Sequence, residues 1–167
     1  MTAHGGPTVV RPAGPDDVDA LLEVQRSSAL TAFAHIFPPE RYPFPSAVVR
    51  AHWAKAVSRP SARVFLAEQA GRAVGLSAVV PGQLESLFVI PSCWGTGTAD
   101  ILYRHALERL AEWPADEYRL WVLEANARAR RFYERRSWRP DGRRSRTSFP
   151  PRPWLVGYTL GHRQRET

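Results

Sequence analysis

A glycine loop between a strand-like segment and a helix-like segment carries the clearest chemical signal in this sequence. Residues 84–90 are read as a buried strand, and Trp94-Gly-Thr-Gly-Thr-Ala-Asp leads from them into an amphipathic segment. The first backbone N–H groups of a helix have no internal acceptors, and the helix dipole adds a partial positive charge there. Gly95 and Gly97 allow the main chain to approach a ligand closely. The junction therefore predicts a site for a phosphate-bearing ligand.

The loop alone also fits a strand-to-helix turn that binds nothing. It lacks the Gly-Lys-Ser/Thr ending of a P-loop, and it lacks the third glycine of a dinucleotide fingerprint. The functional interpretation is a pyrophosphate cradle made of backbone N–H groups from residues 95–100.

A second group of residues lies about thirty positions further along. Asn126, Ala129 and Tyr133 are spaced i, i+3 and i+7, which places them on one face of a helix. Taken singly, Asn126 fits a helix cap and Tyr133 a half-buried core residue. Together with the glycine loop, they favour a ligand site that contains a tyrosine hydroxyl.

The elements that position these residues follow from hydrophobic spacing and turn residues. Strands are expected at 8–11, 62–67, 73–80, 84–90, 118–123 and 154–160. Helices are expected at about 16–31, 46–57 and 126–136, and another follows the glycine loop and includes residues 102–110. Residues 140–153 read as a loop rich in Arg, Ser and Pro. This order predicts an α+β fold of three layers. Its mixed sheet has six to seven strands with about four helices on both faces, and one parallel crossover lies near its centre.

Length and composition indicate one globular domain. The 167 residues, 44% hydrophobic and 23% charged, fit a single domain whose core spans about 8–160, with a flexible tail at 161–167. The N-terminus lacks signal-peptide character, and no apolar run approaches the roughly 18 residues needed to span a membrane. We therefore expect a cytoplasmic protein without membrane contact.

The candidate metal ligands form no site. Cys93 is the only cysteine, which excludes an internal disulfide and a cysteine-based zinc site. It is expected to be a buried, inert thiol. His35, His52 and His105 show no metal-ligand spacing, and no metal is predicted.

Positive charge is concentrated in the C-terminal third. Residues 119–167 hold 13 Arg against 4 acidic residues, a balance of 13 − 4 = +9, although the whole chain carries only +7. Such a segment is either an Arg-rich solvated surface or a surface that faces a polyanion. A basic nucleic-acid-binding domain is one hypothesis, but no helix-turn-helix, RNA-binding or zinc signature supports it, so nucleic acid is not expected as a partner.

The two motifs together resemble the GCN5-related N-acetyltransferase (GNAT) superfamily. Val89-Ile90-Pro91 precedes Trp94-Gly-Thr-Gly-Thr-Ala, similar to the family's acetyl-CoA motif of Arg or Gln, two residues, Gly, one residue, then Gly or Ala. The family's second motif, Asn-x-x-Ala-x-x-Phe-Tyr-Glu, is matched by Asn126, Ala129, Phe132, Tyr133 and Glu134. The resemblance covers the chain from Thr8 to about Leu160.

This resemblance implies a fold, a co-substrate and a set of binding residues. Two central strands would splay, and the pantetheine arm of acetyl-CoA would lie between them like an added strand. The implied binding residues are the main chain of Leu87, Phe88 and Val89, the loop Gly95, Thr96, Gly97, Thr98, Ala99 and Asp100, and Asn126. A primary amine would then attack the thioester directly, with no covalent enzyme intermediate.

The reaction requires two proton movements. An alkylamine of pKa about 10.4 is unprotonated in only roughly one molecule in 2,500 at pH 7, so a base is needed. By its match to the family's Phe-Tyr pair, Tyr133 is the candidate general acid for the leaving thiolate. Glu85 is the candidate general base, because period-two alternation places it on the same strand face as Leu87 and Val89. Glu124 acting through a water, or a water chain to bulk solvent, are the alternatives.

The sequence departs from the family's pattern in the loop. Trp94 occupies the Arg or Gln position, Thr96 replaces a frequent basic residue, and Asp100 stands where a small or basic residue is common. The loop therefore offers main-chain donors and hydroxyls but no positive side chain. Either the affinity for the co-substrate is lowered, or the Arg-rich segment after Arg128 supplies the charge.

The acceptor is expected to be a small-molecule or protein amine that the sequence does not identify. In this family the region 31–45 and the final hairpin usually build the acceptor pocket, and the hairpin is also where a homodimer would form. Here that region holds His35 and the aromatic residues Phe33, Phe37, Tyr42 and Phe44, which core packing explains equally well. A degenerate family member that binds acyl-CoA without catalysis is the alternative to an enzyme.

Overall fold

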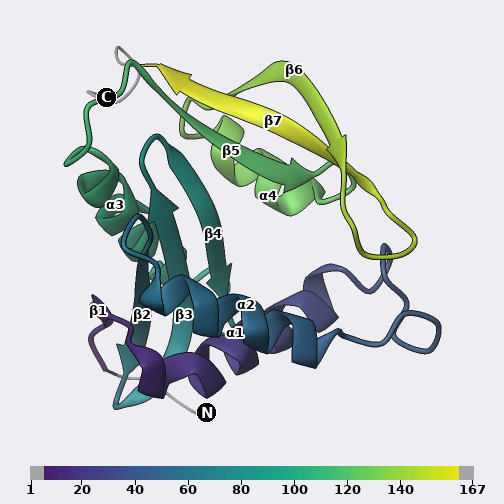
Figure 1. The fold of residues 1–167 in the computed structure, drawn as a ribbon, viewed down its shortest axis with the longest axis horizontal. Coiled ribbons are helices and arrows are strands. Elements are labelled where there is room, and N and C mark those ends of the chain that lie inside the picture. Colours follow the sequence, from purple (N-terminus) through teal and green to yellow (C-terminus); the bar gives the residue numbers. More distant parts are fainter. Residues whose placement is uncertain (1–5, 162–167) are drawn as a thin grey trace.

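Seven strands form one mixed sheet in the order β1-β2-β3-β4-β5-β7-β6 (Figure 1). The computed structural model describes residues 6–161. The strands are β1 (Val9–Pro12), β2 (Arg63–Gln69), β3 (Arg72–Val80), β4 (Gln83–Val89), β5 (Glu117–Leu123), β6 (Arg139–Arg146) and β7 (Trp154–Gly161). The helices are α1 (Val18–Ala32), α2 (Ser46–Ser58), α3 (Thr98–Leu110) and α4 (Ala127–Glu134), with 3-10 turns η1 (Pro15–Asp17) and η2 (Pro91–Cys93). The predicted three-layer α+β architecture is confirmed. Gly161 ends β7, and the rest of the predicted tail lies outside the described residues.

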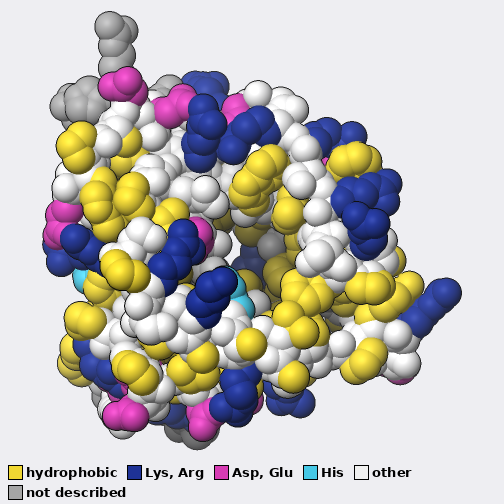
Figure 2. Space-filling model, viewed as in Figure 1, with side chains coloured by type: hydrophobic (Ala, Val, Ile, Leu, Met, Phe, Trp, Pro, Cys, Tyr) yellow, Lys and Arg dark blue, Asp and Glu magenta, His cyan; other side chains and the backbone are white. Residues whose placement is uncertain are grey.

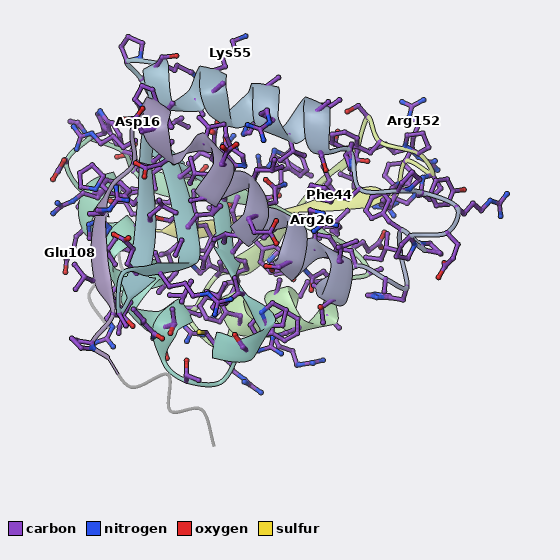
Figure 3. The ribbon with its side chains drawn as sticks, turned by 90° about the horizontal axis from the view of Figure 1, so that it is seen from below. Asp16, Arg26, Phe44, Lys55, Glu108 and Arg152 are labelled. Carbon is purple, nitrogen blue, oxygen red and sulfur yellow. The ribbon has the colours of Figure 1, made fainter. Side chains whose placement is uncertain are left out.

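The helices cover both faces of the sheet. Helices α1 and α2 lie on one face of β2, β3 and β4, and α3 lies on the opposite face, whereas α4 lies against β5 and β7 (Figures 1 and 3). Alternating apolar residues of the strands feed two buried clusters. Leu66 and Leu76 join α1 and α2 around Trp53, and Phe65 and Val79 join a cluster that includes residues of α3, α4, β5 and β7. No helix among the described residues has the length and apolar character to cross a membrane.

Helix α3 sits very close to the sheet. A Cβ built at Gly75 of β3 would lie 2.5 Å from Leu102 Cδ1 and 3.1 Å from the Phe88 carbonyl oxygen. Only glycine leaves room for this contact. The close approach fixes the position of α3, and with it the loop that precedes α3, against β3 and β4.

The sheet divides between β4 and β5. These parallel strands pair only at Gln83 and Arg119, beside a hydrogen bond of 2.9 Å from the Arg119 N–H to the Gly82 carbonyl. Beyond that point the strands diverge (Figure 1), so residues 84–89 have a ladder partner only in β3. The splay implied by the family resemblance is therefore present.

A β-bulge lies in the same strand. Ala78 of β3 faces Ser86 while Val79 faces Leu84, which leaves Glu85 as the extra residue. A bulge interrupts the alternation of side chains. The alternation used to place Glu85 on one face with Leu87 and Val89 therefore does not run through this position.

The prediction that residues 140–153 form a loop is wrong for the first half of that range. Residues 139–146 form β6, which pairs with β7 at the edge of the sheet. The segment has no apolar alternation because nearly all of its side chains are exposed. Charged residues and proline are typical of edge strands, where they prevent pairing with another chain. Such a strand resembles a loop in sequence.

Candidate active site

A cleft of about 530 Å³ opens where β4 leaves β5. Figure 2 shows the corresponding hollow near the centre of the molecular face, with Lys and Arg side chains around it. The lining comes from the end of α1, the last residues of β4, the glycine loop and α4. These residues are Ser28, Ala32, Phe33, Leu87, Phe88, Val89, Trp94, Gly95, Gly97, Ala99, Asp100, Asn126, Arg128, Ala129, Arg131, Phe132, Tyr133, Arg135 and Arg136.

The glycine loop turns its backbone toward the cleft. Gly95 and Gly97 have φ values of +74° and +91°, which glycine adopts without strain, and Gly97 is the residue before the first turn of α3. Among the described residues, the backbone N–H groups of Gly95, Gly97 and the first residues of α3 have no hydrogen-bond acceptor. The start of a 13-residue helix thus presents a row of free donors to the cleft.

The hydroxyls of the loop serve its own structure. Thr98 is buried, and its hydroxyl accepts the Gln69 side-chain amide at 3.1 Å and lies 3.1 Å from the Thr96 hydroxyl. Thr96 donates to the Cys93 carbonyl at 2.5 Å. Cys93 is buried, with its sulfur 3.8 Å from the Gln69 amide oxygen. This polar cluster holds the loop from behind, which leaves the main chain to face a ligand.

Trp94 connects the loop to both neighbouring elements. Its indole N–H donates to the Val89 carbonyl at 2.8 Å, so that carbonyl is already engaged at the end of β4. The guanidinium carbon of Arg128, in the first turn of α4, lies 4.1 Å from the centroid of the Trp94 ring. This cation–π contact brings a positive charge to the position where the family motif has Arg or Gln.

Asp100 is neutralised by an ion pair. Its carboxylate bonds to the guanidinium of Arg136, which also lies 3.5 Å from the centroid of the Phe132 ring. Arg131 and Arg135 line the same cleft. The loop lacks a cation of its own, but α4 and the residues after it surround the free N–H groups with positive charge.

Tyr133 lies buried at the base of the cleft. Its ring packs edge-on against Phe132 and Trp138, with centroids 5.3 and 5.9 Å away. Burial raises the pKa of the Tyr133 hydroxyl well above its ordinary value of about 10. Next to it the Trp138 indole donates to the Tyr103 hydroxyl at 2.8 Å, which fixes the wall behind Tyr133.

Asn126 caps α4 and still has free donors. Its side-chain oxygen accepts the Ala129 N–H at 3.2 Å, the standard N-cap bond. Its amide nitrogen has no acceptor among the described residues, and Asn126 lines the cleft. The structural role considered for Asn126 is therefore present, and it leaves the NH₂ group available to a ligand carbonyl.

A polar bridge fixes α4 on β7. Arg130 donates to the Tyr158 hydroxyl at 3.0 Å, and that hydroxyl donates to Glu134 at 2.7 Å. A second guanidinium nitrogen of Arg130 donates to the Glu124 carbonyl at 3.1 Å. These bonds hold the helix that carries Asn126 and Tyr133 at a fixed position over the diverging strands.

The predicted base and its alternative lie outside the lining of this cleft. Glu85 is half-buried at the bulge, and its carboxylate lies 3.8 Å from an Arg59 nitrogen. Glu124, at the end of β5, is engaged by Arg144 at 2.8 Å. His35 contacts the same corner, with its Nε2 3.1 Å from the Ala125 carbonyl.

The structure brings most of the predicted site residues together. Leu87, Phe88, Val89, Gly95, Gly97, Ala99, Asp100, Asn126 and Tyr133 line the cleft, whereas Glu85, Thr96 and Thr98 do not. Phe33, one of the aromatic residues named for the acceptor region, lines the cleft at the end of α1. Ser28 of α1 was not predicted, since nothing in the local sequence ties that helix to the loop. Of the predicted aromatic acceptor residues, Phe44 packs against the core instead. Among the described residues no cluster of His, Cys, Asp and Glu fits a metal ion.

Solved structures share this fold. A GCN5-related N-acetyltransferase from Rhodopseudomonas palustris matches with a TM-score of 0.77 at 17% identity, over 96% of this chain and 99% of that one. The PaiA N-acetyltransferase of Thermoplasma acidophilum, in complex with coenzyme A, matches with a TM-score of 0.66 at 15% identity, over 92% and 99%.

Sequence comparisons identify the family. An uncharacterized N-acetyltransferase of Mycobacterium tuberculosis is 31% identical over 100 residues, which span 57% of this chain and 64% of that protein. An uncharacterized N-acetyltransferase of Archaeoglobus fulgidus is 30% identical over 135 residues, 74% of this chain and 88% of that protein. The family model described as "Acetyltransferase (GNAT) family" matches residues 28–138. The chain therefore belongs to the GNAT acetyltransferase family.

Proposed function

We propose that this protein transfers the acetyl group of acetyl-CoA to a primary amine by direct attack in a ternary complex. The observation that carries the proposal is one cleft that combines an unpaired strand edge, a row of free backbone N–H groups at a helix start and a buried tyrosine hydroxyl. Family membership supports it. When bound, acetyl-CoA supplies an acetyl group activated as a thioester.

The donor set fits acetyl-CoA. The edge of β4 at Leu87 and Phe88 would pair with the pantetheine amides, since β5 has left that edge without a strand partner. The free N–H groups from Gly95 to Asp100 would bind the pyrophosphate. Arg128, stacked on Trp94, would supply the charge that the loop itself lacks. The Asn126 amide would donate to a pantetheine carbonyl.

Glu85 would accept a proton from the acceptor ammonium, directly or through a water. It is half-buried at the bulge beside the splay, and its carboxylate lies 3.8 Å from an Arg59 nitrogen. Glu124 is less suited to this role because Arg144 already engages its carboxylate.

Tyr133 would act mainly as a hydrogen-bond donor. Its raised pKa lies above that of a thiol, about 8.5, so complete proton transfer to the leaving thiolate is unfavourable. A donated hydrogen bond still stabilises the charge that develops on sulfur, and the same raised pKa keeps the phenol protonated. The acceptor amine, once acylated, releases its own proton to the base or to solvent.

Release of free thiol from acetyl-CoA in the presence of a panel of primary amines tests the proposal. The wild-type protein should release thiol only with an amine present, and Tyr133→Phe should lower kcat by roughly 10²-fold. Tyr103→Phe is the matched control, since Tyr103 is a buried neighbour that does not line the cleft. A wild-type protein that binds acetyl-CoA in calorimetry but transfers acetyl to no amine would instead be a non-catalytic acyl-CoA-binding member.

A further inference from the structure

A stacked Arg–Trp–Arg cluster lies on the final hairpin, outside the cleft. Arg144 and Arg146 of β6 hold their guanidinium carbons 4.2 and 4.4 Å from the centroid of the Trp154 ring, at the start of β7. Trp154 is 37% exposed, unusual for so large an apolar side chain. Figure 2 shows Lys and Arg side chains gathered over this hairpin. The cluster is a preformed cationic surface on an aromatic base.

One of these two cations has no counter-charge. Arg144 is paired with Glu124 at 2.8 Å, whereas Arg146 has no carboxylate or hydrogen-bond partner among the described residues. Stacking leaves the N–H groups of a guanidinium free to bind an oxyanion in its plane. The ring also holds the side chain in place, so less rotamer entropy is lost on binding. Arg146 is therefore prepared for an anion that this part of the protein does not provide.

The cluster borders the open end of the splay. The Trp154 carbonyl accepts the Glu124 N–H at 2.9 Å, two residues before Asn126 caps α4. His35 ties loop 33–45 to the same corner through the Ala125 carbonyl. Loop 147–153, which carries Arg152, lies beside loop 33–45 in both ribbon views (Figures 1 and 3). An acceptor that enters between these loops would pass the cluster.

The span between this corner and Tyr133 sets the length of such an acceptor. Seven residues of α4 separate the corner at Asn126 from Tyr133, which is roughly 10 Å along a helix axis. The backbone bond from Glu124 to Trp154 joins the cluster to that corner, so we take a span of this order between an amine at the thioester and an oxyanion on the cluster as part of the proposal. An extended peptide covers that span in about three residues, at roughly 3.3 Å each.

Resting on the proposed function, we infer that the preferred acceptor is an acidic peptide: a primary amine followed, about three residues away, by carboxylates that bind Arg146 and Arg144 on Trp154. The positive field of the hairpin attracts such a substrate and disfavours polyamines of like charge. Binding then depends on ionic strength, since the contact is exposed.

Paired peptides test the inference. One peptide, Ser-Ala-Ala-Glu-Glu-Ala with an amidated C-terminus, is compared with its Ser-Ala-Ala-Gln-Gln-Ala analogue in the thiol-release assay. The wild-type protein should prefer the acidic peptide by about tenfold in kcat/KM, through KM, with a preference that shrinks as salt increases. Arg146→Gln should reduce that preference about fivefold and leave the KM for acetyl-CoA unchanged.

The matched control is Arg139→Gln, on the same strand at the other end of the hairpin. It removes the same charge from an exposed position whose side chain has no partner among the described residues, and it should retain the preference. Equal kcat/KM for the two peptides in the wild-type protein, or an equal effect of both Arg variants, overturns the inference.

A binding arm separates this inference from the proposed catalysis. Calorimetry with the two peptides on wild-type and Arg146→Gln protein reports recognition without turnover. If the wild-type protein binds the acidic peptide selectively and Arg146→Gln weakens that binding, the inference is supported even when no thiol is released. That result would contradict only the proposed transferase activity. Absence of selectivity in binding overturns the inference even if simple amines are acetylated.

Discussion

Single residues in the cleft combine a structural contact with the chemical role proposed for them. Trp94 bonds the end of β4 through its indole and supports Arg128 through its ring, so a departure from the family motif is compensated by a neighbouring helix. Asn126 caps α4 with its oxygen and keeps its nitrogen free. Tyr133 is held by aromatic contacts. Substitutions that separate the two roles of each residue are the informative ones.

Asn126→Asp should separate capping from ligand binding. Aspartate caps a helix as well as asparagine, but it lacks the NH₂ donor and adds a negative charge near the thioester. We expect a near-normal melting temperature with a KM for acetyl-CoA raised about tenfold. Asn126→Ala should lose about 1 kcal/mol of stability as well. An unchanged KM in Asn126→Asp would restrict this residue to the cap.

Arg128→Gln should raise the KM for acetyl-CoA about five- to tenfold, with little change in kcat. The variant loses the cation stacked on Trp94 while the free N–H groups of the loop remain. The comparison is Arg104→Gln on the exposed face of α3, which removes the same charge away from the cleft. Equal KM values in the two variants would show that Arg128 does not contact the phosphates.

The pH dependence should show no alkaline loss from Tyr133. Burial raises the pKa of its hydroxyl, so the phenol stays protonated as the acceptor amine loses its proton with rising pH. Between about pH 6.5 and 9.5 the rate at subsaturating amine should rise with pH in wild type and Tyr133→Phe alike, with parallel profiles. A fall above about pH 8.5 that only the wild type shows would mean that Tyr133 ionises during the reaction.

At the scale of elements, α3 determines where the glycine loop lies. The helix rests on β3 at Gly75 and is continuous with the loop, which the Gln69 and Thr98 side chains fasten to the sheet edge. The contacts that fix the loop come from β2, β3, β4, α3 and α4, so the protein itself sets the shape of the loop.

Gly75→Val should destabilise the protein by about 2–3 kcal/mol. Even a single added Cβ would meet Leu102 at 2.5 Å and the Phe88 carbonyl at 3.1 Å, and the backbone oxygen cannot move without disturbing β4. The comparison is Ser77→Ala two residues along the same strand, where the buried hydroxyl has no partner among the described residues and its removal should be neutral or stabilising. Urea denaturation of both variants gives the two free energies, and equal values would contradict the close-packing argument.

Much of this element-scale description could be predicted from sequence. The glycine loop, the face of α4 and the long helices are local patterns, and they lie where spacing placed them. Strand β6 could not be predicted, because an exposed edge strand carries no apolar alternation. The Asp100–Arg136 pair and the α1 side chains in the cleft join residues far apart in the chain, and local sequence carries no signal for such contacts. The bulge at Glu85 depends on register with β3, which alternation in one strand does not reveal.

At the scale of the whole molecule, a half-buried histidine links stability to pH. His105 packs edge-on against Phe65 with centroids 4.5 Å apart, and its Nδ1 has no partner among the described residues. Burial, with Arg109 nearby, lowers its pKa, so the folded protein favours the neutral ring. The stability this gives is complete above the unfolded value of about 6.5 and is lost as pH falls below it, because the unfolded chain takes up the proton first.

His105→Leu should flatten the decline in melting temperature between about pH 6.5 and 5. The comparison is His52→Leu on the exposed surface of α2. Thermal unfolding is measured across that pH range. If the melting temperature of His105→Leu falls with pH as steeply as that of the wild type, His105 does not cause the decline.

The parting of β4 from β5 places an unsatisfied strand edge inside the molecule instead of at its border. An open edge invites pairing with any extended chain and is a common origin of aggregation. Here the edge is recessed, and the guanidinium groups of Arg128, Arg131 and Arg135 stand around its entrance. A second polypeptide strand needs room for side chains on both of its faces, whereas a thin ligand with phosphates at one end needs a narrow slot and cations. The feature that would otherwise make this sheet prone to misassembly thus becomes a filter for the molecules that can complete it.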